Sequence, residues 1–505
     1  MNILFNKRLP ISIGLFVLLF VVTWPLYQYI SDVDGIGYAA VAHHYIDGNL
    51  KLAVNGFWNP LHSWLVIPFM KAGLSDWAAF KVSNAVFAIG SLITLFSLVN
   101  KFTLQPWLKT AIQFTSVIIL LSYTYFELAA DALLVFLLLL YFNLVKSDSF
   151  FSSTGKNIFA GILGAFLYFT KSYGFPFFIF HFIVIHLFLN PDKKQALKQL
   201  ALGFTAFFLL TFPWIYALHW KYDAWMIAFG KYNAHWSFTD IPASDPIIQP
   251  PPYEGSSSVW EDPWHVKKDN FNSVPFVTLF LHQIRVVLFN FQHWLATIHD
   301  LSFLSSAILL LSAVFYFFQK SKTWLYLIIT LLCLPAGYLL LHIETRFIWA
   351  LSFIFLIAGS LLMQHLFSKV NIKYWQSVLI WLILFGSFLL EPVNLLKDKI
   401  YQHKEFFETV KYMNQFQIKG KFTSNEQMGE SMVIAYLSKN SYYSIAKPTY
   451  SIDSLLNEID HYQIQHYFFY YRSIQQKEEF MMGKIAARAE TKQEIQPGLI
   501  VFSFY

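Results

Sequence analysis

Asp32 and Asp34 are the residues of this chain best suited to chemistry, because two carboxylates stand two positions apart directly after the first long apolar segment. A carboxylate can act as a general base and take a proton from a hydroxyl or an amine. Tyr38 and Ala42 follow Asp34 at four-residue steps, so one face of a short helix would carry all three, with either aspartate as its N-cap. We therefore interpret 31–69 as the stretch around which a site is built.

Aromatic and imidazole side chains follow within the same stretch. Tyr38, Trp58 and His62 are candidate substrate-binding residues, since each joins a flat ring to a polar atom. A loop that simply runs into water would explain one aspartate and the glycines, but it explains these rings less well. His43 and His44 are better interpreted as residues of the membrane interface than as metal ligands.

Ionisable residues also stand at the ends of later apolar segments. Glu127 and Asp131 stand at the same end of one predicted span. Lys171 lies at the junction of two spans, and Glu344 and Arg346 lie at another such junction. Charges near a hydrocarbon core are expensive and usually have a partner or a function. Each also has a simpler explanation, because a lysine can extend to the lipid headgroups and an acid can pair with a neighbouring helix or turn. As a set, acids beside isolated cations suit a reaction in which a base activates a nucleophile while cations hold a departing phosphate.

The composition places these residues in a polytopic membrane protein. The 505 residues are 56% hydrophobic and only 13% charged, whereas a soluble domain carries about 25% charge. Apolar runs of about 20 residues, the length that crosses a bilayer as a helix, recur along most of the chain. The net charge of +6 reflects lysines in loops rather than a nucleic-acid surface. Cys333 is the only cysteine, which excludes an intramolecular disulfide and a cysteine metal cluster.

The apolar runs predict about 11 transmembrane helices. The predicted spans are 11–30, 76–99, 107–125, 127–145, 157–172, 174–190, 199–219, 301–319, 323–342, 346–367 and 373–392. With a cytoplasmic N-terminus, every predicted inside loop carries at least two basic residues, as the positive-inside rule requires. The odd number of spans then puts the C-terminus outside, and all the candidate residues above share that outer face.

Two domains are expected from this layout. Residues 1–396 would form the transmembrane catalytic domain, with a first external loop at 31–75 that contains interfacial helices and a large external loop at 220–300. The end of the large loop, 274–297, is apolar but interrupted by polar residues, which indicates an amphipathic helix in the interface. If it spans the membrane instead, the C-terminal region moves to the cytoplasm. Charged residues are more frequent in 397–505, and this segment is predicted to form an extracytoplasmic soluble α/β domain.

Short motifs resemble those of the GT-C glycosyltransferases, polytopic membrane enzymes that use lipid-phosphate sugars. The closer similarity is to the branch that holds the protein O-mannosyltransferases and the lipid A aminoarabinose transferases, whose members carry an Asp-acid-x-x-Tyr-Ala pattern in the first external loop. The similar segments here are Asp34-Gly35-Ile36-Gly37-Tyr38-Ala39, Asn59-Pro60-Leu61-His62-Ser63-Trp64-Leu65 and Glu344-Thr345-Arg346-Phe347. Gly35 replaces the second acid of the pattern, and Gly37 stands where some members have arginine.

The resemblance implies a GT-C fold and an inverting sugar transfer. Asp34 would be the general base, with Asp32 as the alternative, and Asp131 would orient the acceptor or share the base role. Lys171 and Arg346 would stabilise the departing polyprenyl phosphate.

The resemblance also implies partners and a location. Tyr38, Trp58, His62 and Glu344 would contact substrates. Family members need no nucleotide-sugar, so no cofactor is required, and a divalent metal ion is an option. The donor would be a polyprenyl-phosphate-linked sugar, and the acceptor a lipid, a glycan or a protein. A bacterial inner membrane, with the site and the C-terminus on the periplasmic side, fits the composition.

Three other classes of function remain open. A polytopic transporter or flippase of lipid-linked saccharides would also hold charges within its bundle, but inverted repeats are typical of many transporters and none is visible here. A membrane polymerase or ligase of surface glycans could use the same donors. A structural or assembly protein would tolerate Asp34→Asn without loss of function.

Overall fold

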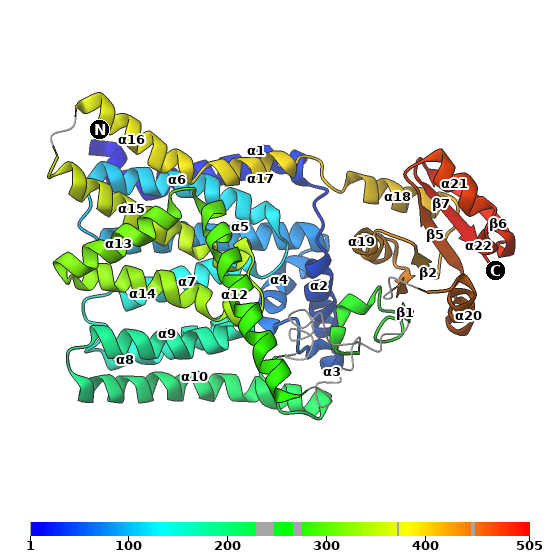
Figure 1. Ribbon diagram of the computed structural model, residues 1–505, viewed down its shortest axis with the longest axis horizontal. Helices are drawn as coiled ribbons and strands as arrows, with labels where there is room; N and C mark the ends of the chain where they lie inside the picture. Colours follow the sequence, from blue (N-terminus) through cyan, green and yellow to red (C-terminus); the bar gives the residue numbers. More distant parts are fainter. Residues whose placement is uncertain (1, 229–246, 266–274, 371–372, 446–449, 505) are drawn as a thin grey trace.

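The computed structural model describes residues 2–228, 247–265, 275–370, 373–445 and 450–504. A bundle of roughly parallel and antiparallel helices forms one end of the molecule, and a smaller part with a β-sheet forms the other, where the chain ends (Figure 1). Between them lie the segments that follow α1 (Asn2–Tyr27) and part of the large loop 220–300. This middle region is where the candidate residues lie.

Helices coincide with all of the predicted spans. Besides α1 they are α5 (Asp76–Asn100), α6 (Pro106–Phe126), α7 (Asp131–Val145), α8 (Thr154–Thr170), α9 (Gly174–Leu189), α10 (Lys193–Tyr222), α13 (Ser305–Gln319), α14 (Lys322–Ala336), α15 (Ala350–Phe367) and the pair α16 (Tyr374–Ser387) and α17 (Leu390–Asp398). Local chemistry sets their starts. Pro106 occupies the first turn of α6, and the Asp192 side chain accepts hydrogen bonds from two backbone N–H groups of α10.

The chain is a helical membrane protein, but the number of its spans stays a prediction. Five of the described helices are long and apolar enough to cross a membrane, or up to seven if each of two bent pairs counts as one span. Several predicted boundaries differ from the structure, among them the start of α7 and the end of α14. Residues 127–130 form an extended turn before α7, and α14 ends at Ala336, one residue after Pro335. Short 3-10 turns, η4 (Tyr338–Leu340) and η5 (Thr345–Ile348), follow α14. Arg346 lies in η5, and Glu344 directly precedes it.

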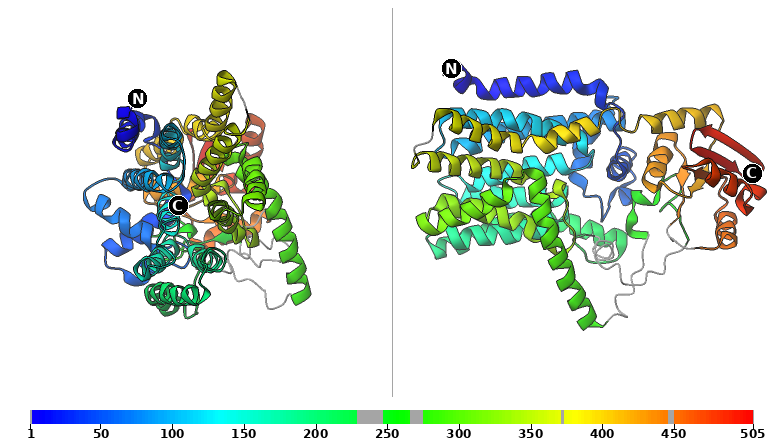
Figure 2. Two further views of the ribbon diagram at one scale, coloured as in Figure 1. Left: turned by 90° about the vertical axis from the view of Figure 1, so that its left-hand side faces the viewer. Right: turned by 45° about the horizontal axis from the view of Figure 1, so that its top comes forward.

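A helix, α12 (Phe276–Leu301), occupies the amphipathic segment predicted at 274–297. It meets α13 at an angle of 102° and crosses the direction of the bundle helices (Figure 1), and one of its ends projects from the bundle (Figure 2). Apolar side chains such as Phe276, Phe280 and Leu288 are exposed along it. A helix that lies across the bundle direction with an exposed apolar side suits a membrane interface, and that location stays a prediction.

The predicted first external loop folds into three helices, α2 (Val33–Ile46), α3 (Leu50–Ala53) and α4 (Pro60–Lys71). Asp32 is the N-cap of α2, and its side chain accepts a hydrogen bond from the backbone N–H of Asp34 at 3.1 Å. A Cβ added at Gly37 would lie 2.1 Å from Trp58 Nε1, so the Trp58 ring packs against the helix backbone here. The glycine in the motif is therefore required by the packing of α2.

The C-terminal part contains a five-stranded sheet in the order β3-β2-β5-β7-β6. The strands β2 (Lys421–Ser424), β3 (Ser441–Tyr442) and β5 (His466–Tyr470) are parallel, whereas β7 (Leu499–Ser503) pairs antiparallel with β5 and with β6 (Thr491–Gln496). The helices of this part are α18 (Lys404–Gln415), α19 (Met428–Ser438), α20 (Ile452–Tyr462), α21 (Ile474–Met481) and α22 (Lys484–Arg488).

One described part of the predicted large external loop, 247–265, connects the bundle with the sheet region. Its strand β1 (Ile248–Gln249) pairs antiparallel with β4 (Ser444–Ile445), and its turns are η1 (Val259–Glu261) and η2 (Pro263–His265). On the bundle side, Asn55 Nδ2 donates to the Glu261 carbonyl at 2.8 Å. Residues 229–246 and 266–274 of the predicted loop 220–300 lie outside the described residues.

Candidate active site

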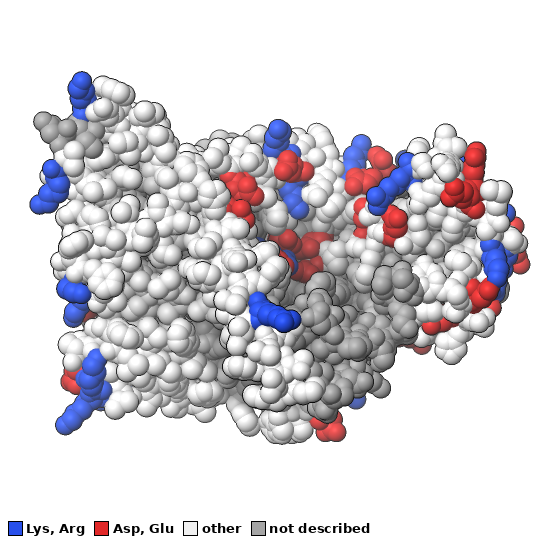
Figure 3. Space-filling view, in the orientation of Figure 1, with Lys and Arg blue, Asp and Glu red and all other residues white. Residues whose placement is uncertain are grey.

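Segments that are distant in the sequence meet where the bundle faces the sheet region. Asp34 lies in the first turn of α2, Asp131 is the first residue of α7, Lys171 directly follows α8, and Arg346 lies in η5. Acidic side chains gather in a hollow between the two parts of the molecule (Figure 3). The structure thus brings together four of the residues that were predicted separately from the sequence, and we call them, with Glu127, the ionic cluster.

Arg346 is the centre of the ionic cluster. Its Nη1 lies 2.9 Å from Asp34 Oδ2, 3.4 Å from Glu127 Oε2 and 4.0 Å from Asp131 Oδ2. Its Nε donates to Glu344 Oε2 at 2.6 Å. Because only 17% of its side chain is exposed, these interactions are little screened by solvent. Four carboxylates around one guanidinium keep Arg346 charged and leave the site with an excess of acid.

Asp131 and Lys171 form the second ion pair of the ionic cluster. Lys171 Nζ lies 2.5 Å from Asp131 Oδ1, and the Asp131 side chain is completely buried. The position of Asp131 at the start of α7 lets the helix dipole favour its negative charge. The ammonium group also lies 4.7 Å from the centre of the Phe347 ring. Lys171 therefore points into the site, and the alternative in which it extends to lipid headgroups does not fit this geometry.

Asp34 contacts both Arg346 and the large loop. Besides the contact with Arg346, its Oδ1 accepts a hydrogen bond from Trp260 Nε1 at 3.3 Å. Burial raises the pKa of Asp34, the nearby Asp32 raises it further, and Arg346 works in the opposite direction. A carboxylate whose pKa lies above the ordinary aspartate value is a better proton acceptor than an exposed one, provided that it is ionised at the working pH.

Two glutamates flank the guanidinium, and their pKa values are shifted in opposite directions. Burial and the charge of Asp32 raise the pKa of Glu127 well above its ordinary value, although Arg346 opposes the shift. Burial also acts to raise the pKa of Glu344, but hydrogen bonds from His342 and Arg346 outweigh it and hold this pKa at about 2. Glu344 is thus ionised and fixes the orientation of Arg346, whereas Glu127 can hold a proton.

Asp32 has a structural task in this conformation. One carboxylate oxygen accepts from the Asp34 N–H at 3.1 Å, and the other accepts from the Leu128 N–H at 3.1 Å. These bonds join the start of α2 to the turn before α7. Both oxygens are engaged with the backbone, which leaves Asp34 as the better placed of the two candidate bases.

The predicted substrate-binding rings form a layer beneath α2. Tyr38, Trp58 and His62 are 3%, 4% and 0% exposed, and the ring centres of Trp58 and His62 lie 5.1 and 5.4 Å from that of Tyr38. Burial lowers the pKa of His62 to about 3, so its ring is neutral. These side chains support the helix that carries Asp34. Trp58 Nε1 also donates to the Trp260 carbonyl at 2.7 Å, which positions the indole that contacts Asp34.

A cavity of about 370 Å³ opens beside the ionic cluster. It is lined by Arg346, Glu127 and Glu344 on one side and by residues of α12 and α17 on another, including Asp300 and Glu391. Its apolar wall consists of Tyr123, Phe126, Trp349 and Phe388. The cavity therefore combines ring faces with hydrogen-bonding carboxylates directly next to the guanidinium.

Within the described residues, no group of three or more His, Cys, Asp or Glu side chains has a geometry that could hold a metal ion. His43 instead pairs with Asp76 at 3.1 Å, and His44 lies 2.7 Å from the Tyr253 hydroxyl. The residues present thus do not form a ready-made metal site in this conformation.

Sequence reasoning missed the contribution of the large loop. Trp260 was not among the candidates, because a Pro- and Trp-rich loop gives no sign of which residue it presents. Glu127 was noticed but given no role. Its signal was available, since an acid at the end of an apolar segment, four residues before Asp131, predicts two carboxylates in one place.

Comparison with known proteins shows similarity in structure only. No protein-family model matches the sequence, and no curated protein sequence matches it. The oligosaccharyltransferase of Archaeoglobus fulgidus in the apo form is similar, with a TM-score of 0.58, 11% identity and coverage of 92% of this chain and 69% of that chain. A second similar structure is the archaeal oligosaccharyltransferase AglB from the same organism, in complex with an inhibitory peptide and a dolichol-phosphate. Its TM-score is 0.57 at 11% identity, with coverage of 92% of this chain and 69% of that chain.

ArnT from Cupriavidus metallidurans bound to undecaprenyl phosphate is similar over nearly the whole of both chains. The TM-score is 0.56 at 9% identity, with coverage of 97% of this chain and 98% of that chain. AglB and ArnT are members of the GT-C superfamily. The GT-C fold that the short motifs predicted is therefore confirmed, and the protein is a multi-pass membrane protein of that fold.

Proposed function

We propose that this protein is an inverting glycosyltransferase that moves a sugar from a polyprenyl-phosphate carrier to an acceptor on the extracytoplasmic face of the membrane. The observation that carries the proposal is the contact of the Asp34 carboxylate with Arg346 beside the buried Lys171–Asp131 pair, at the edge of a cavity. A base and two cations in one place are what this reaction needs. The similar structures of AglB and ArnT contain dolichol-phosphate and undecaprenyl phosphate, which supports a lipid-phosphate donor.

In the proposed reaction Asp34 takes the proton from an acceptor hydroxyl or amine. The acceptor oxygen or nitrogen forms a bond to the anomeric carbon as the bond from that carbon to the phosphate oxygen breaks. The carbon is inverted, the electron pair of the broken bond leaves with the polyprenyl phosphate, and the proton stays on Asp34 until solvent removes it. Removal of the base costs about 100- to 10,000-fold in rate.

Arg346 and Lys171 stabilise the phosphate as it gains charge. In the absence of donor they are occupied by carboxylates, so the donor phosphate competes with Asp34 and Asp131 for them. Protonation of Glu127, whose pKa is raised by burial, reduces the negative charge that the phosphate meets. Asp131 keeps Lys171 in place, orients the acceptor or shares the base role.

The cavity next to Arg346 is the proposed place of the sugar. The half-buried ring of Phe126 suits the apolar face of a sugar, backed by the buried stack of Trp349 on Tyr123, and Glu344 can accept hydrogen bonds from its hydroxyl groups. In this proposal Tyr38, Trp58 and His62 position α2 rather than contact the substrate. The segment 247–265 and the predicted soluble domain 397–505 would shape the acceptor side.

The proposal places the protein in a cell inner membrane, with the site and the C-terminus on the periplasmic side. No cofactor is required, and a divalent metal ion that joins the acids of the ionic cluster is the second option. Activity that survives a strong chelator supports the first option, and activity that a chelator removes and Mg²⁺ or Mn²⁺ restores supports the second.

The test is a panel of polyprenyl-phosphate sugars offered to the purified protein in detergent, with donor loss and product followed by mass spectrometry. The parent should consume one donor, and Asp34→Asn should not. Saturable donor binding without turnover, equal in the parent and in Asp34→Asn, would favour a transporter or flippase. Repeated addition of sugars to one glycan would instead identify a polymerase.

A further inference from the structure

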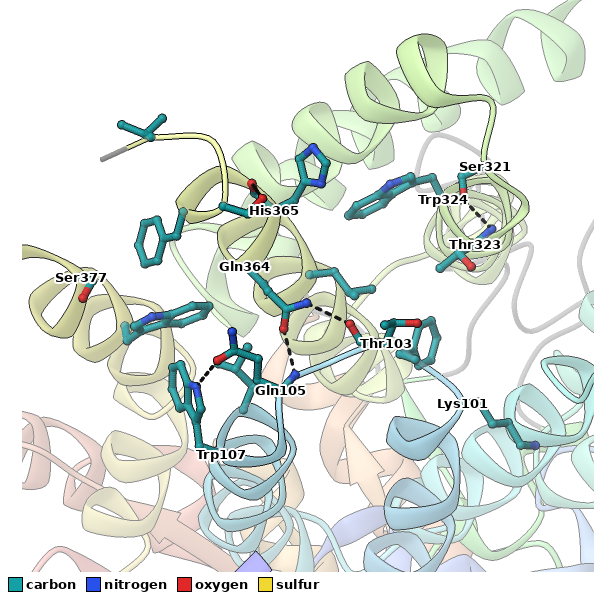
Figure 4. Close-up of a pocket in the computed structure, with 17 residues that line it drawn as sticks. Lys101, Thr103, Gln105, Trp107, Ser321, Thr323, Trp324, Gln364, His365 and Ser377 are labelled. Atoms are coloured by element: carbon teal, nitrogen blue, oxygen red, sulfur yellow. Dashed lines mark hydrogen bonds between the residues drawn. The ribbon is translucent and has the colours of Figure 1, made fainter. Parts of the chain in front are cut away.

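A second cavity lies at the opposite end of the bundle from the ionic cluster. Its volume is about 750 Å³, and it is formed by the ends of α6, α14, α15 and α16 and by the connection between α5 and α6 (Figure 4). This is the end that carries the exposed lysines of several connecting loops (Figure 3). The reaction proposed above makes no use of this cavity.

The cavity wall carries no negatively charged side chain among the described residues, because none of those that line it is Asp or Glu. Lys322 and Lys369 are both exposed and lie next in sequence to the lining residues Ser321, Thr323, Ser368 and Val370, and we call them the rim lysines. Lys101 lines the cavity but donates its Nζ proton to the Asn143 carbonyl and is directed away from the centre (Figure 4). The wall therefore does not repel an anion, and the nearby rim lysines can attract one.

Hydrogen-bond donors inside the cavity are left available by the local network. Trp107 Nε1 donates to Gln105 Oε1 at 2.6 Å, which leaves the amide nitrogen of Gln105 as a donor. Trp324 Nε1 donates to Gln319 Oε1, so the Gln319 amide nitrogen donates to His365 Nε2 at 3.2 Å. His365 therefore carries its proton on Nδ1, a second donor on the wall.

Tryptophan rings complete the cavity. Trp107 and Trp381 pack edge to face with ring centres 5.0 Å apart, and Trp324 lies on another helix of the wall. Indole rings with one polar atom are enriched at the level of the lipid headgroups. A cavity with such rings, neutral donors, nearby rim lysines and an acid-free wall has the properties of a lipid headgroup site.

We propose that this cavity binds the phosphodiester headgroup of an anionic phospholipid from the membrane leaflet on the lysine-rich side. The headgroup phosphate accepts hydrogen bonds from Gln105 and His365, while Lys322 and Lys369 attract the negative charge. The bound lipid bridges α6, α14, α15 and α16, so it stabilises the bundle at the end remote from the ionic cluster. The inference does not depend on the reaction proposed for that site.

The test uses the whole protein in detergent, titrated with phosphatidylglycerol, with phosphatidylcholine or with inorganic phosphate. Bound lipid is counted by native mass spectrometry, and thermal unfolding is followed in parallel. The parent should bind and be stabilised by phosphatidylglycerol in preference to phosphatidylcholine. Equal binding of the two lipids, or equal stabilisation by inorganic phosphate alone, would overturn the proposal.

Charge-removing variants test whether the lipid binds at this cavity. The double variant Lys322→Gln/Lys369→Gln should weaken phosphatidylglycerol binding by about fivefold per lysine at low salt. The matched control Lys194→Gln/Lys198→Gln removes the same charge from exposed positions of α10, in another predicted inside loop, and should leave binding unchanged. A loss in the control as large as in the rim variant would show general attraction to a charged surface and would refute the site.

A change within the wall keeps the proposal testable if the rim variant behaves poorly. Gln105→Glu replaces the donor amide by a carboxylate while Trp107 keeps an oxygen to donate to. It should abolish the preference for phosphatidylglycerol, with Gln195→Glu on α10 as the matched control. Retained preference in Gln105→Glu would contradict the proposed place of the phosphate.

Discussion

Variants of the Asp131–Lys171 ion pair can separate its contribution to stability from its contribution to activity. Lys171→Met leaves the fully buried Asp131 with Arg346 Nη1 as its nearest described cation, 4.0 Å from Oδ2. Asp131 Oδ2 already has no hydrogen-bond partner among the described residues. Breaking a buried pair from one side costs about 3–5 kcal/mol, because the remaining charge is uncompensated. We take the lower end, about 3 kcal/mol, since 17% of Lys171 is exposed.

The double variant Lys171→Met/Asp131→Asn removes both charges and should recover most of that loss. An unfolding entropy of roughly 2 cal/mol/K per residue gives roughly 1 kcal/mol/K for this chain, so 3 kcal/mol corresponds to about 3 °C in Tm. The single variant should therefore melt about 3 °C below the parent. The double variant should melt within about 1 °C of the parent, with a coupling energy of about 2 kcal/mol.

Activity should not recover with stability. The cation that stabilises the departing phosphate is absent in both variants, and the loss of one such group costs about 100- to 1,000-fold in rate. The assay combines thermal unfolding in detergent with donor turnover for the parent, both single variants and the double variant. Additive shifts in Tm would refute the buried pair. A stable double variant that turns over at the rate of the parent would refute the role of Lys171.

Three further predictions follow from the same cluster. Burial raises the pKa of Asp34 above 3.8, and the ionised form is the active base, so kcat/KM should fall as the pH drops through this raised pKa. A pH–rate profile measures this, and a fall that occurs only at or below pH 3.8 would contradict the assignment of Asp34 as the base. The folded pKa of Glu127 lies above its unfolded value, so its contribution to stability is present at low pH and lost as the pH rises through the folded pKa. Glu127→Gln should therefore raise Tm at pH 8 but not at pH 4, and no difference at pH 8 would contradict the shift. Arg346→Lys keeps the charge but cannot contact Asp34 and Glu344 together, so it should raise the KM for the donor by tenfold or more, which titration of donor against turnover measures.

The helical layout was predictable because burial in a membrane leaves long apolar runs that stand out from the loops. The boundaries were less predictable where polar residues interrupt a run. The turn at 127–130 and the end of α14 at Ala336 depend on which backbone groups find partners, such as the Leu128 N–H that donates to Asp32. Hydropathy does not contain that information.

The candidate site was predictable in its residue types and only partly in its geometry. Asp34, Asp131, Lys171 and Arg346 attracted attention because each is a charge at the end of an apolar segment, and these four do meet. The pairing of Trp260 with Asp34 spans 226 positions, so no local pattern could predict it.

The buried rings show a second limit of sequence reasoning. Tyr38, Trp58 and His62 were predicted to contact substrate, which stays a prediction, and in this structure they are almost completely buried and pack at α2. A ring with a polar atom has the same appearance in the sequence whether it faces a ligand or a helix.

The most direct test of the account compares Asp34→Asn with Asp32→Asn in single-turnover transfer from the donor that the parent uses. The account predicts that Asp34→Asn loses about 100-fold or more in rate. It predicts that Asp32→Asn stays within about tenfold of the parent, because the asparagine oxygen still caps α2 and only the hydrogen bond from the Leu128 N–H is lost. A parent-like rate in Asp34→Asn, or a loss confined to Asp32→Asn, would contradict the assignment of Asp34 as the base.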